Sequence, residues 1–253
     1  MEHWQDQAII LGMRRHGENG AVVSLLTQHH GRQAGYVRGA QGSRLRGTLE
    51  VGNQVDAIWR ARTSDDLGSL TLELDRSPAA HIMQDPLKLA ALQSACALCD
   101  TALPEREGHA GLFHGMNALL DALQSEVWGA AYVMWEIALL KELGFALDLS
   151  RCAGGGDEEA LAYVSPKTGR AVSAAAGAPY KEKLLPLPNF LKPAAGGSDE
   201  GDVLTGLKMT GYFIEHWVYA HHSAGPPEAR LRFEDRFSSM LNSLSEELTV
   251  GAI

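Results

Sequence analysis

The sequence predicts an α+β protein in which a five-stranded barrel is followed by a mostly α-helical domain with a small irregular insert. Three observations support this fold class. Short apolar or alternating segments separated by turn residues fill the first 76 positions, helical periodicity starts after Ser77 and Pro78, and glycine and proline are frequent between 145 and 200. Five short strands at near-regular spacing are typical of a small closed or partly open barrel. We therefore expect domains at 1–79 and 80–253, the second of which contains the insert at 146–200.

The expected strands are short segments of apolar or alternating composition. They cover residues 8–13, 21–27, 34–40, 53–62 and 68–75. Turn signals rich in glycine, histidine, serine or aspartate separate them, at 16–20, 30–31, 39–47 and 64–66. Clean alternation in the last two segments predicts strands with one buried face and one exposed face.

The expected helices follow from apolar residues that recur at helical spacing. They cover residues 86–103, 109–123, 126–144, 203–222 and about 229–248. Asp85 followed by Pro86 predicts a helix N-cap and its first helical position. The segment 126–144 is apolar on most sides, which predicts a helix that runs through a bundle core, and Gly144 is placed to end it. Within the insert only 161–173 shows a hairpin pattern, so we expect the insert to have little core of its own.

Composition limits the classes of protein that fit the chain of 253 residues. Three cysteines cannot form a disulfide framework and suit a reducing compartment. No uninterrupted apolar run reaches the roughly 18 residues that a transmembrane helix needs. The first residues are acidic and turn basic only at Arg14, which is the reverse of a secretory signal. These observations predict a cytoplasmic protein without a membrane partner.

Charge is distributed unevenly, although the net charge of −9 disfavours a nucleic-acid partner when taken alone. Residues 14–62 contain eight arginines and three acidic residues, which gives this segment a net charge of +5. Lysine is absent before Lys88. From residue 81 onward 13 basic and 22 acidic residues give −9. The chain therefore has a basic N-terminal segment and an acidic remainder.

No motif for catalysis or metal binding stands out, and we expect neither an enzyme nor a cofactor. Cys96 and Cys99 form a C-x-x-C pair inside an apolar helical segment without a second pair, which favours buried core cysteines over a zinc site. Neighbouring residues point in different directions on a helix or a strand, so neither His29 with His30 nor the pair at 221–222 is expected to present both rings to one metal. The chain lacks H-E-x-x-H, G-x-S-x-G and phosphate-loop signatures.

The arginines carry the clearest functional signal. Arg38, Arg44 and Arg46 surround a glycine-punctuated stretch that begins at Tyr36. Glycine lets a backbone approach phosphates closely, and the guanidinium fork suits bidentate phosphate contact. Single-stranded nucleic acid is held by such a cationic groove together with exposed aromatic or apolar platforms for the bases. A small barrel with this loop therefore predicts DNA or RNA binding.

Several short motifs occur in order along the chain. They are Ile10, Leu11 and Arg14 at the start, Gly17-Glu18, Leu25 to Thr27 with Gly31, the segment 37–40, the E-L-G-F end of a long helix at 142–145 and the P-P-x-x-R-x-R segment at 226–232. This ordered set resembles bacterial RecO, a family of recombination mediators that anneal DNA. The similarity spans nearly the whole chain. No single element is diagnostic, so the order of the set carries the resemblance.

The resemblance implies an N-terminal OB-fold, a helical domain, and binding to single- and double-stranded DNA. It also implies binding to RecR and to the C-terminal tail of the single-stranded-DNA-binding protein, and joint loading of RecA onto coated DNA. A DNA-binding member of this family is expected to be associated with the nucleoid. The residues to which the resemblance assigns DNA contact are Arg14, Arg15, Arg32, Arg38, Arg44 and Arg46.

One departure from the family concerns zinc. Many members carry four cysteines after the E-L-G position, whereas this chain has only Cys152 there. A tetrahedral structural site needs four ligands. We therefore expect the insert to be a degenerate, zinc-free version.

A receptor for an acidic tail needs an apolar pocket flanked by cations. In the acidic half of the chain we favour Lys141, Arg230 and Arg232, because rigid helices hold a pocket better than the insert that carries Lys181 and Lys183. Two other functions stay open: a barrel that serves as a protein-interaction scaffold without direct DNA contact, and a metal-dependent hydrolase built on the histidines. Salt-dependent oligonucleotide binding separates the first from DNA binding, and a metal assay tests the second.

Overall fold

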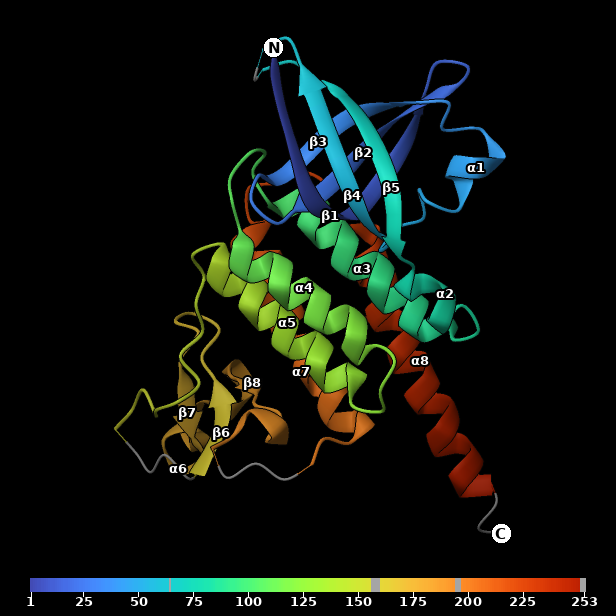
Figure 1. The fold of residues 1–253 in the computed structure, drawn as a ribbon. Coiled ribbons are helices and arrows are strands. Elements are labelled where there is room, and N and C mark those ends of the chain that lie inside the picture. The colour runs from blue at the N-terminus through green and yellow to red at the C-terminus, as the bar shows by residue number, and fades with distance from the viewer. Residues whose placement is uncertain (64, 156–159, 194–196, 251–253) are drawn as a thin grey trace. The chain divides into compact units, whose positions relative to one another are not determined.

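The computed structural model describes residues 1–63, 65–155, 160–193 and 197–250, and it leaves the side chains of Arg44 and of 245–250 undescribed. The chain forms two compact units, which Figure 1 colours by residue number. The first unit is Met1–Gln124 with Pro227–Arg230, and the second is Ser125–Pro226 with Leu231–Ile253. The first unit therefore extends beyond residue 79, after which the sequence predicted a domain boundary.

Five strands close into a barrel in the first unit (Figure 1). They are β1 (Glu2–His16), β2 (Gly20–Thr27), β3 (Gly31–Arg38), β4 (Gln54–Ala61) and β5 (Ser69–Arg76). The order is β1-β2-β3-β5-β4, with β4 pairing antiparallel to β1 and β3 meeting β5 in parallel at Tyr36 and Ser69. The short helix α1 (Ser43–Arg46) lies between β3 and β4. This five-stranded barrel confirms the α+β class and the OB-fold.

Alternation of side chains explains why these segments close around a core. On β4, Val55, Ala57, Trp59 and Ala61 are buried, and the residues between them are more exposed. Gly35 leaves room for the interior, because a Cβ there would lie 2.6 Å from the Leu70 side chain. Strand β1 is longer than the expected 8–13, since its polar first residues pair with β4 although they form no apolar run.

Three helices follow the barrel in the first unit: α2 (Pro78–Ile82), α3 (Pro86–Ala102) and α4 (Ala110–Ala122). The Asp85 side chain accepts hydrogen bonds from the backbone N–H groups of Leu87 and Lys88, which confirms the expected N-cap. Cys96 and Cys99 are fully buried on α3, and burial raises the pKa of both thiols. The interpretation of this pair as core cysteines is therefore confirmed.

The second unit is built on α5 (Trp128–Glu142), α7 (Glu200–Phe213) with a π-helical continuation (Ile214–Val218), and the part of α8 (Glu228–Val250) that starts at Leu231. Tyr132 of α5 packs on Phe233 of α8, with ring centroids 4.7 Å apart. The carboxylate of Glu136 is buried and accepts a hydrogen bond from the Thr210 hydroxyl of α7. Helix α5 nevertheless has an exposed edge, where the side chain of Met134 is 58% exposed. Its apolar residues are therefore not all in the core.

The insert contains a three-stranded sheet in the order β7-β6-β8. Its strands are β6 (Leu161–Val164), β7 (Ala171–Ser173) and β8 (Leu185–Pro186), and the short helix α6 (Ala174–Gly177) follows β7 in the chain. The hairpin expected at 161–173 is confirmed. Leu161, Val164 and Leu187 of the insert are buried.

Cys152 in the insert is also buried, and its Sγ accepts a hydrogen bond from the backbone N–H of Ser173 at 3.2 Å. Among the residues that the structure describes, no group of three or more histidine, cysteine or acidic side chains could hold a metal ion. Within the same residues, no helix is both long enough and apolar enough to cross a membrane.

Candidate nucleic-acid interface

The outer surface of β1, β2 and β3, here called the β1–β3 face, collects several residues that the sequence singles out. Arg14 is paired with Val22 across β1 and β2, and Val22 is paired with Tyr36 across β2 and β3. One row further along, Gly20 is paired with Arg38. Paired residues share one face of a sheet, so Arg14, Tyr36 and Arg38 point outward together.

The Tyr36 ring lies over β2. A Cβ on Gly20 would be only 2.2 Å from the Tyr36 hydroxyl oxygen and 2.4 Å from two ring carbons. The ring of His16 meets Tyr36 edge-on, with centroids 5.9 Å apart. Because a side chain at position 20 would displace the ring, Gly20 leaves room for an aromatic surface on the face that Arg14 and Arg38 share. Sequence reasoning did not assign Tyr36 a contact of its own, although it marked the start of the arginine loop.

Arg15 and Arg46 lie elsewhere on the barrel. Arg15 is paired with Ala21, and Ala21 with Val37, both of which are buried in the barrel. Alternation therefore sends Arg15, exposed at the end of β1, to the side opposite Arg14. Arg46 is exposed at the end of α1, and the Arg44 side chain lies outside the described residues.

Arg32 shares the β1–β3 face but is engaged within the chain. Its side chain is 18% exposed. Nε donates a hydrogen bond to the Leu103 carbonyl at 2.8 Å, and Nη1 lies 3.3 Å from Glu105 and 3.6 Å from Asp100. The guanidinium therefore ties β3 to the end of α3. Neither acid carries a local sequence signal, because both lie some 70 positions further along the chain.

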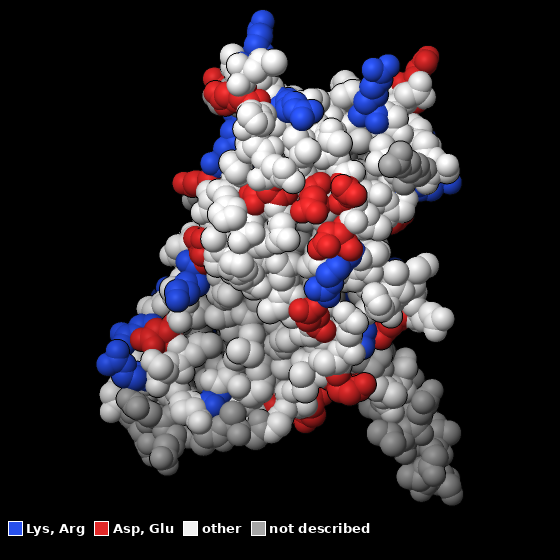
Figure 2. Space-filling model, viewed as in Figure 1, with Lys and Arg blue, Asp and Glu red and all other residues white. Residues whose placement is uncertain are grey.

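Acidic side chains are also exposed on the other strands of the barrel. In the view of Figure 2, several Asp and Glu side chains gather in a band, whereas Lys and Arg are scattered over the visible face. Exposed acids on β4 and β5 include Asp56, Glu73 and Asp75. Strands β4 and β5 therefore carry exposed acids together with exposed arginines, among them Arg60 and Arg76.

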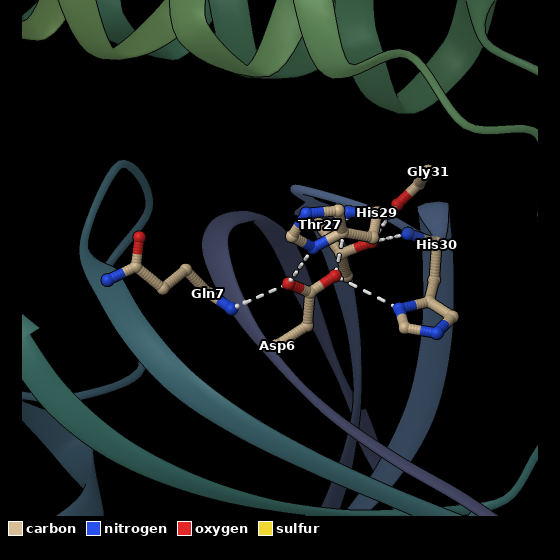
Figure 3. Close-up of polar contacts among 6 residues, drawn as sticks. All are labelled: Asp6, Gln7, Thr27, His29, His30 and Gly31. Carbon is tan, nitrogen blue, oxygen red and sulfur yellow. Dashed lines mark hydrogen bonds and ion pairs between the residues drawn. The ribbon is translucent and has the colours of Figure 1, made fainter.

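His29 and His30 contact the same carboxylate, although side-chain directions on a regular helix or strand would point the two rings apart. Both rings turn to one carboxylate, with Nδ1 of His29 2.9 Å from Asp6 Oδ1 and Nδ1 of His30 3.0 Å from Asp6 Oδ2 (Figure 3). The two histidines lie in the turn between β2 and β3, where the side-chain directions of a helix or strand do not apply. The shared group is the carboxylate of Asp6.

Asp6 is held at the centre of this cluster with its side chain 3% exposed. Burial alone would raise the pKa of Asp6, but the backbone N–H of His29 and both imidazoles donate to the carboxylate and bring that pKa below its ordinary value. Trp4 stacks on His30 with ring centroids 4.5 Å apart and on Trp59 at 5.8 Å. The cluster fastens the turn that leads into β3.

The second unit holds a pocket of about 430 Å³. Its apolar lining comes from α5 through Met134 and Ile137 and from later segments through Leu147, Leu149 and Leu191, with Lys192 at its edge. Lys141 follows Ile137 by one helical turn and is exposed. This pocket could not be predicted from the sequence, because three separate segments form its walls.

The other basic residues proposed for a partner tail differ in exposure. Arg232 is exposed on α8. Arg230 is 1% exposed, so its guanidinium does not reach a carboxylate of a partner in this arrangement.

Comparison with known proteins gives matches over almost the whole chain. Residues 1–76 match the family model described as Recombination protein O N terminal, and residues 83–223 match the one described as Recombination protein O C terminal. A protein of Rhodospirillum centenum named DNA repair protein RecO is 54% identical over 237 residues, covering 92% of this chain and 94% of the relative. Proteins with the same name from Rhodospirillum rubrum and Caulobacter sp. strain K31 are 48% and 47% identical, covering 93% and 92% of this chain and 96% of each relative.

Proposed function

The chain belongs to the RecO family of DNA repair proteins, and from this we propose that it binds DNA through the β1–β3 face, anneals complementary single strands and helps to load RecA onto DNA coated by the single-stranded-DNA-binding protein. The observation that carries the proposal is the register that brings Arg14, Tyr36 and Arg38 to one outer face. DNA binding would also associate the protein with the nucleoid.

The chemistry of this face suits a single strand. Exposed guanidinium groups at Arg14 and Arg38 bind phosphates whatever the base sequence, and the ring of Tyr36 offers a surface on which a base stacks. Sequence-independent binding suits annealing, because an annealing protein must hold any pair of complementary strands. Arg46, exposed at the end of α1, is a further cation outside the β1–β3 face.

The pocket in the second unit supports a site for the acidic tail of the single-stranded-DNA-binding protein. Met134, Ile137 and Leu191 provide an apolar surface for a terminal hydrophobic side chain, and Lys192 and Lys141 provide nearby cations for carboxylates. Arg232 is the alternative cation, on a different helix. RecR is a further proposed partner, supported by family membership alone.

Strand annealing tests the proposal directly. Wild-type protein should accelerate annealing of complementary oligonucleotides, both bare and coated by the single-stranded-DNA-binding protein. The double variant Arg14→Ala/Arg38→Ala should lose both activities, whereas Arg60→Ala, which removes an exposed arginine from β4, should keep them. If no salt-dependent DNA binding is found, the barrel serves as a protein-interaction scaffold and the proposal fails.

The tail site needs its own experiment. A labelled peptide with an acidic, hydrophobic C-terminus should bind wild type, and Lys141→Glu should weaken binding while Arg232→Glu leaves it unchanged. Weakening by Arg232→Glu alone would move the site to α8. Equal binding by all three proteins would remove both positions.

A further inference from the structure

A pocket of about 410 Å³ opens on the β1–β3 face, where the strands meet the end of α3. Gly12, Ser24 and Ala34 form its floor and are one row of the sheet, since Gly12 is paired with Ser24 and Ser24 with Ala34. Three strands side by side span about 10 Å. Small side chains across that width leave a floor on which a planar ring can lie.

The rim of this pocket carries both donors and acceptors. Arg14 and Arg32 contribute guanidinium groups, and Asp100 and Glu105 contribute carboxylates. Oδ1 of Asp100 accepts a hydrogen bond from the Ser24 hydroxyl and lies 3.6 Å from Arg32. Oδ2 of Asp100 has no hydrogen-bond partner among the described residues, and it lies on the Gly12 side, 3.4 Å from where a Cβ of that residue would be. The Asp100 side chain is 34% exposed and that of Glu105 47%, so both can meet a ligand.

This combination does not suit a phosphate, because two carboxylates beside the guanidinium groups repel an anion. It suits a neutral planar group that has adjacent donors on one edge and acceptors on another. Guanine has both features: N1–H and the N2 amino group donate side by side, and O6 and N7 accept from arginine in the most common base-specific contact. Cytosine and adenine each offer an amino donor without the neighbouring ring N–H. Thymine has one N–H between two acceptors, which a carboxylate repels.

We propose that the pocket floored by Gly12, Ser24 and Ala34 binds one guanine base of a single DNA strand, with Asp100 accepting hydrogen bonds from its donor edge. The inference rests on the proposed DNA binding by the same face. It adds a base preference to a surface whose phosphate contacts are independent of sequence.

Fluorescence anisotropy with short labelled strands tests the pocket. The strands are dT tracts of about 12 nucleotides, within the length that one OB-fold covers, carrying dT, dA, dG or deoxyinosine at the centre. Wild type should bind the dG strand about tenfold more tightly than the dT strand, which is within the range for a bidentate base contact. Deoxyinosine lacks the N2 amino group, so most of the preference should disappear with it.

Two variants separate recognition from structure. Asp100→Asn should abolish the preference for dG while it leaves binding to the dT strand unchanged or tighter, and Asp56→Asn, which changes an exposed carboxylate of β4, should keep the preference. Glu105→Gln provides a second variant of the pocket that keeps the Ser24–Asp100 hydrogen bond.

The outcomes distinguish this inference from the proposed function. Equal binding of all four strands by wild type overturns the guanine pocket and leaves DNA binding intact, whereas loss of binding to every strand overturns both. A uniform loss of affinity in Asp100→Asn assigns Asp100 a structural role and also overturns the inference. Free dGMP that binds as tightly as the dG strand overturns the assignment to DNA.

Discussion

The two ends of β3 carry arginines on the same outer face, yet their surroundings differ. Arg38 is exposed at the end of the strand, and the described residues include no ion pair with it. Arg32, near the start, donates to the Leu103 carbonyl and faces Asp100 and Glu105. Residue type and strand face are therefore insufficient to assign a DNA contact. An arginine is available to a phosphate only where the fold leaves its guanidinium unsatisfied.

The largest effect expected from this difference is on DNA affinity. Arg14→Ala/Arg38→Ala should weaken binding to single strands about tenfold or more for each arginine, since a hydrogen bond to a charged group contributes roughly 1.5–3 kcal/mol. Two lost phosphate contacts should also reduce the slope of log affinity against log salt concentration by about 1.4. Affinity measured over a salt series checks both numbers. An unchanged slope would remove these arginines from the interface.

The opposite behaviour is expected of Arg32→Ala. Loss of the bond to Leu103 and of the two acidic contacts should lower the free energy of unfolding by about 1–2 kcal/mol, which is typical when a partly buried hydrogen-bonded group is removed. The salt slope for DNA should stay close to that of wild type, because this guanidinium is already engaged. Urea denaturation and the same salt series give the two readouts. A reduced slope at full stability would place Arg32 among the phosphate contacts.

How far the sequence predicts these roles depends on the range of the interactions involved. Short apolar or alternating segments place all five strands because these patterns depend on neighbouring residues, and the cap at Asp85 is equally local. The sequence did not predict that the first residues of β1 form a strand, because their pairing with β4 depends on positions more than 45 residues away. For the same reason, the sequence did not predict the acids beside Arg32 or the residues that line the two pockets, since they come from distant parts of the chain.

Side-chain direction in turns is a second limit on prediction. His29 and His30 were expected to diverge, as they would on regular elements, whereas the turn before β3 directs both rings to Asp6. Arg14 and Arg15 show the reverse case. Once the register is known, simple alternation separates them, but the sequence alone treats both as members of one basic cluster.

Asp6 is a second charged group that the fold encloses near the start of β3, the end that carries Arg32. Its pKa is lower in the folded chain than the ordinary value near 3.9, so the stabilisation is present above that value and is lost as the pH falls through the folded pKa. Wild type should therefore lose stability on acidification below about pH 4. Asp6→Asn should be less stable at neutral pH and show a weaker dependence over that acid range. Parallel curves for the two proteins would show that Asp6 contributes nothing to acid unfolding.

The smallest effect on DNA affinity is expected for Arg15, which is compared with Arg14 on the same strand. Arg15 follows Arg14 directly, but its partners Ala21 and Val37 belong to the buried face, so its side chain leaves β1 on the other side. Arg15→Ala should change DNA affinity by about twofold or less, the usual range for an exposed substitution outside a contact, while Arg14→Ala alone gives the full effect of one phosphate contact. Both single variants keep the strand pairing, because the backbone makes it, so their thermal stability serves as a control for folding. If Arg15→Ala weakens binding as much as Arg14→Ala, the strand of DNA passes around the end of the β1–β2 hairpin and contacts both of its sides. The DNA-binding surface would then be the hairpin tip, and the one-sided β1–β3 face would be wrong.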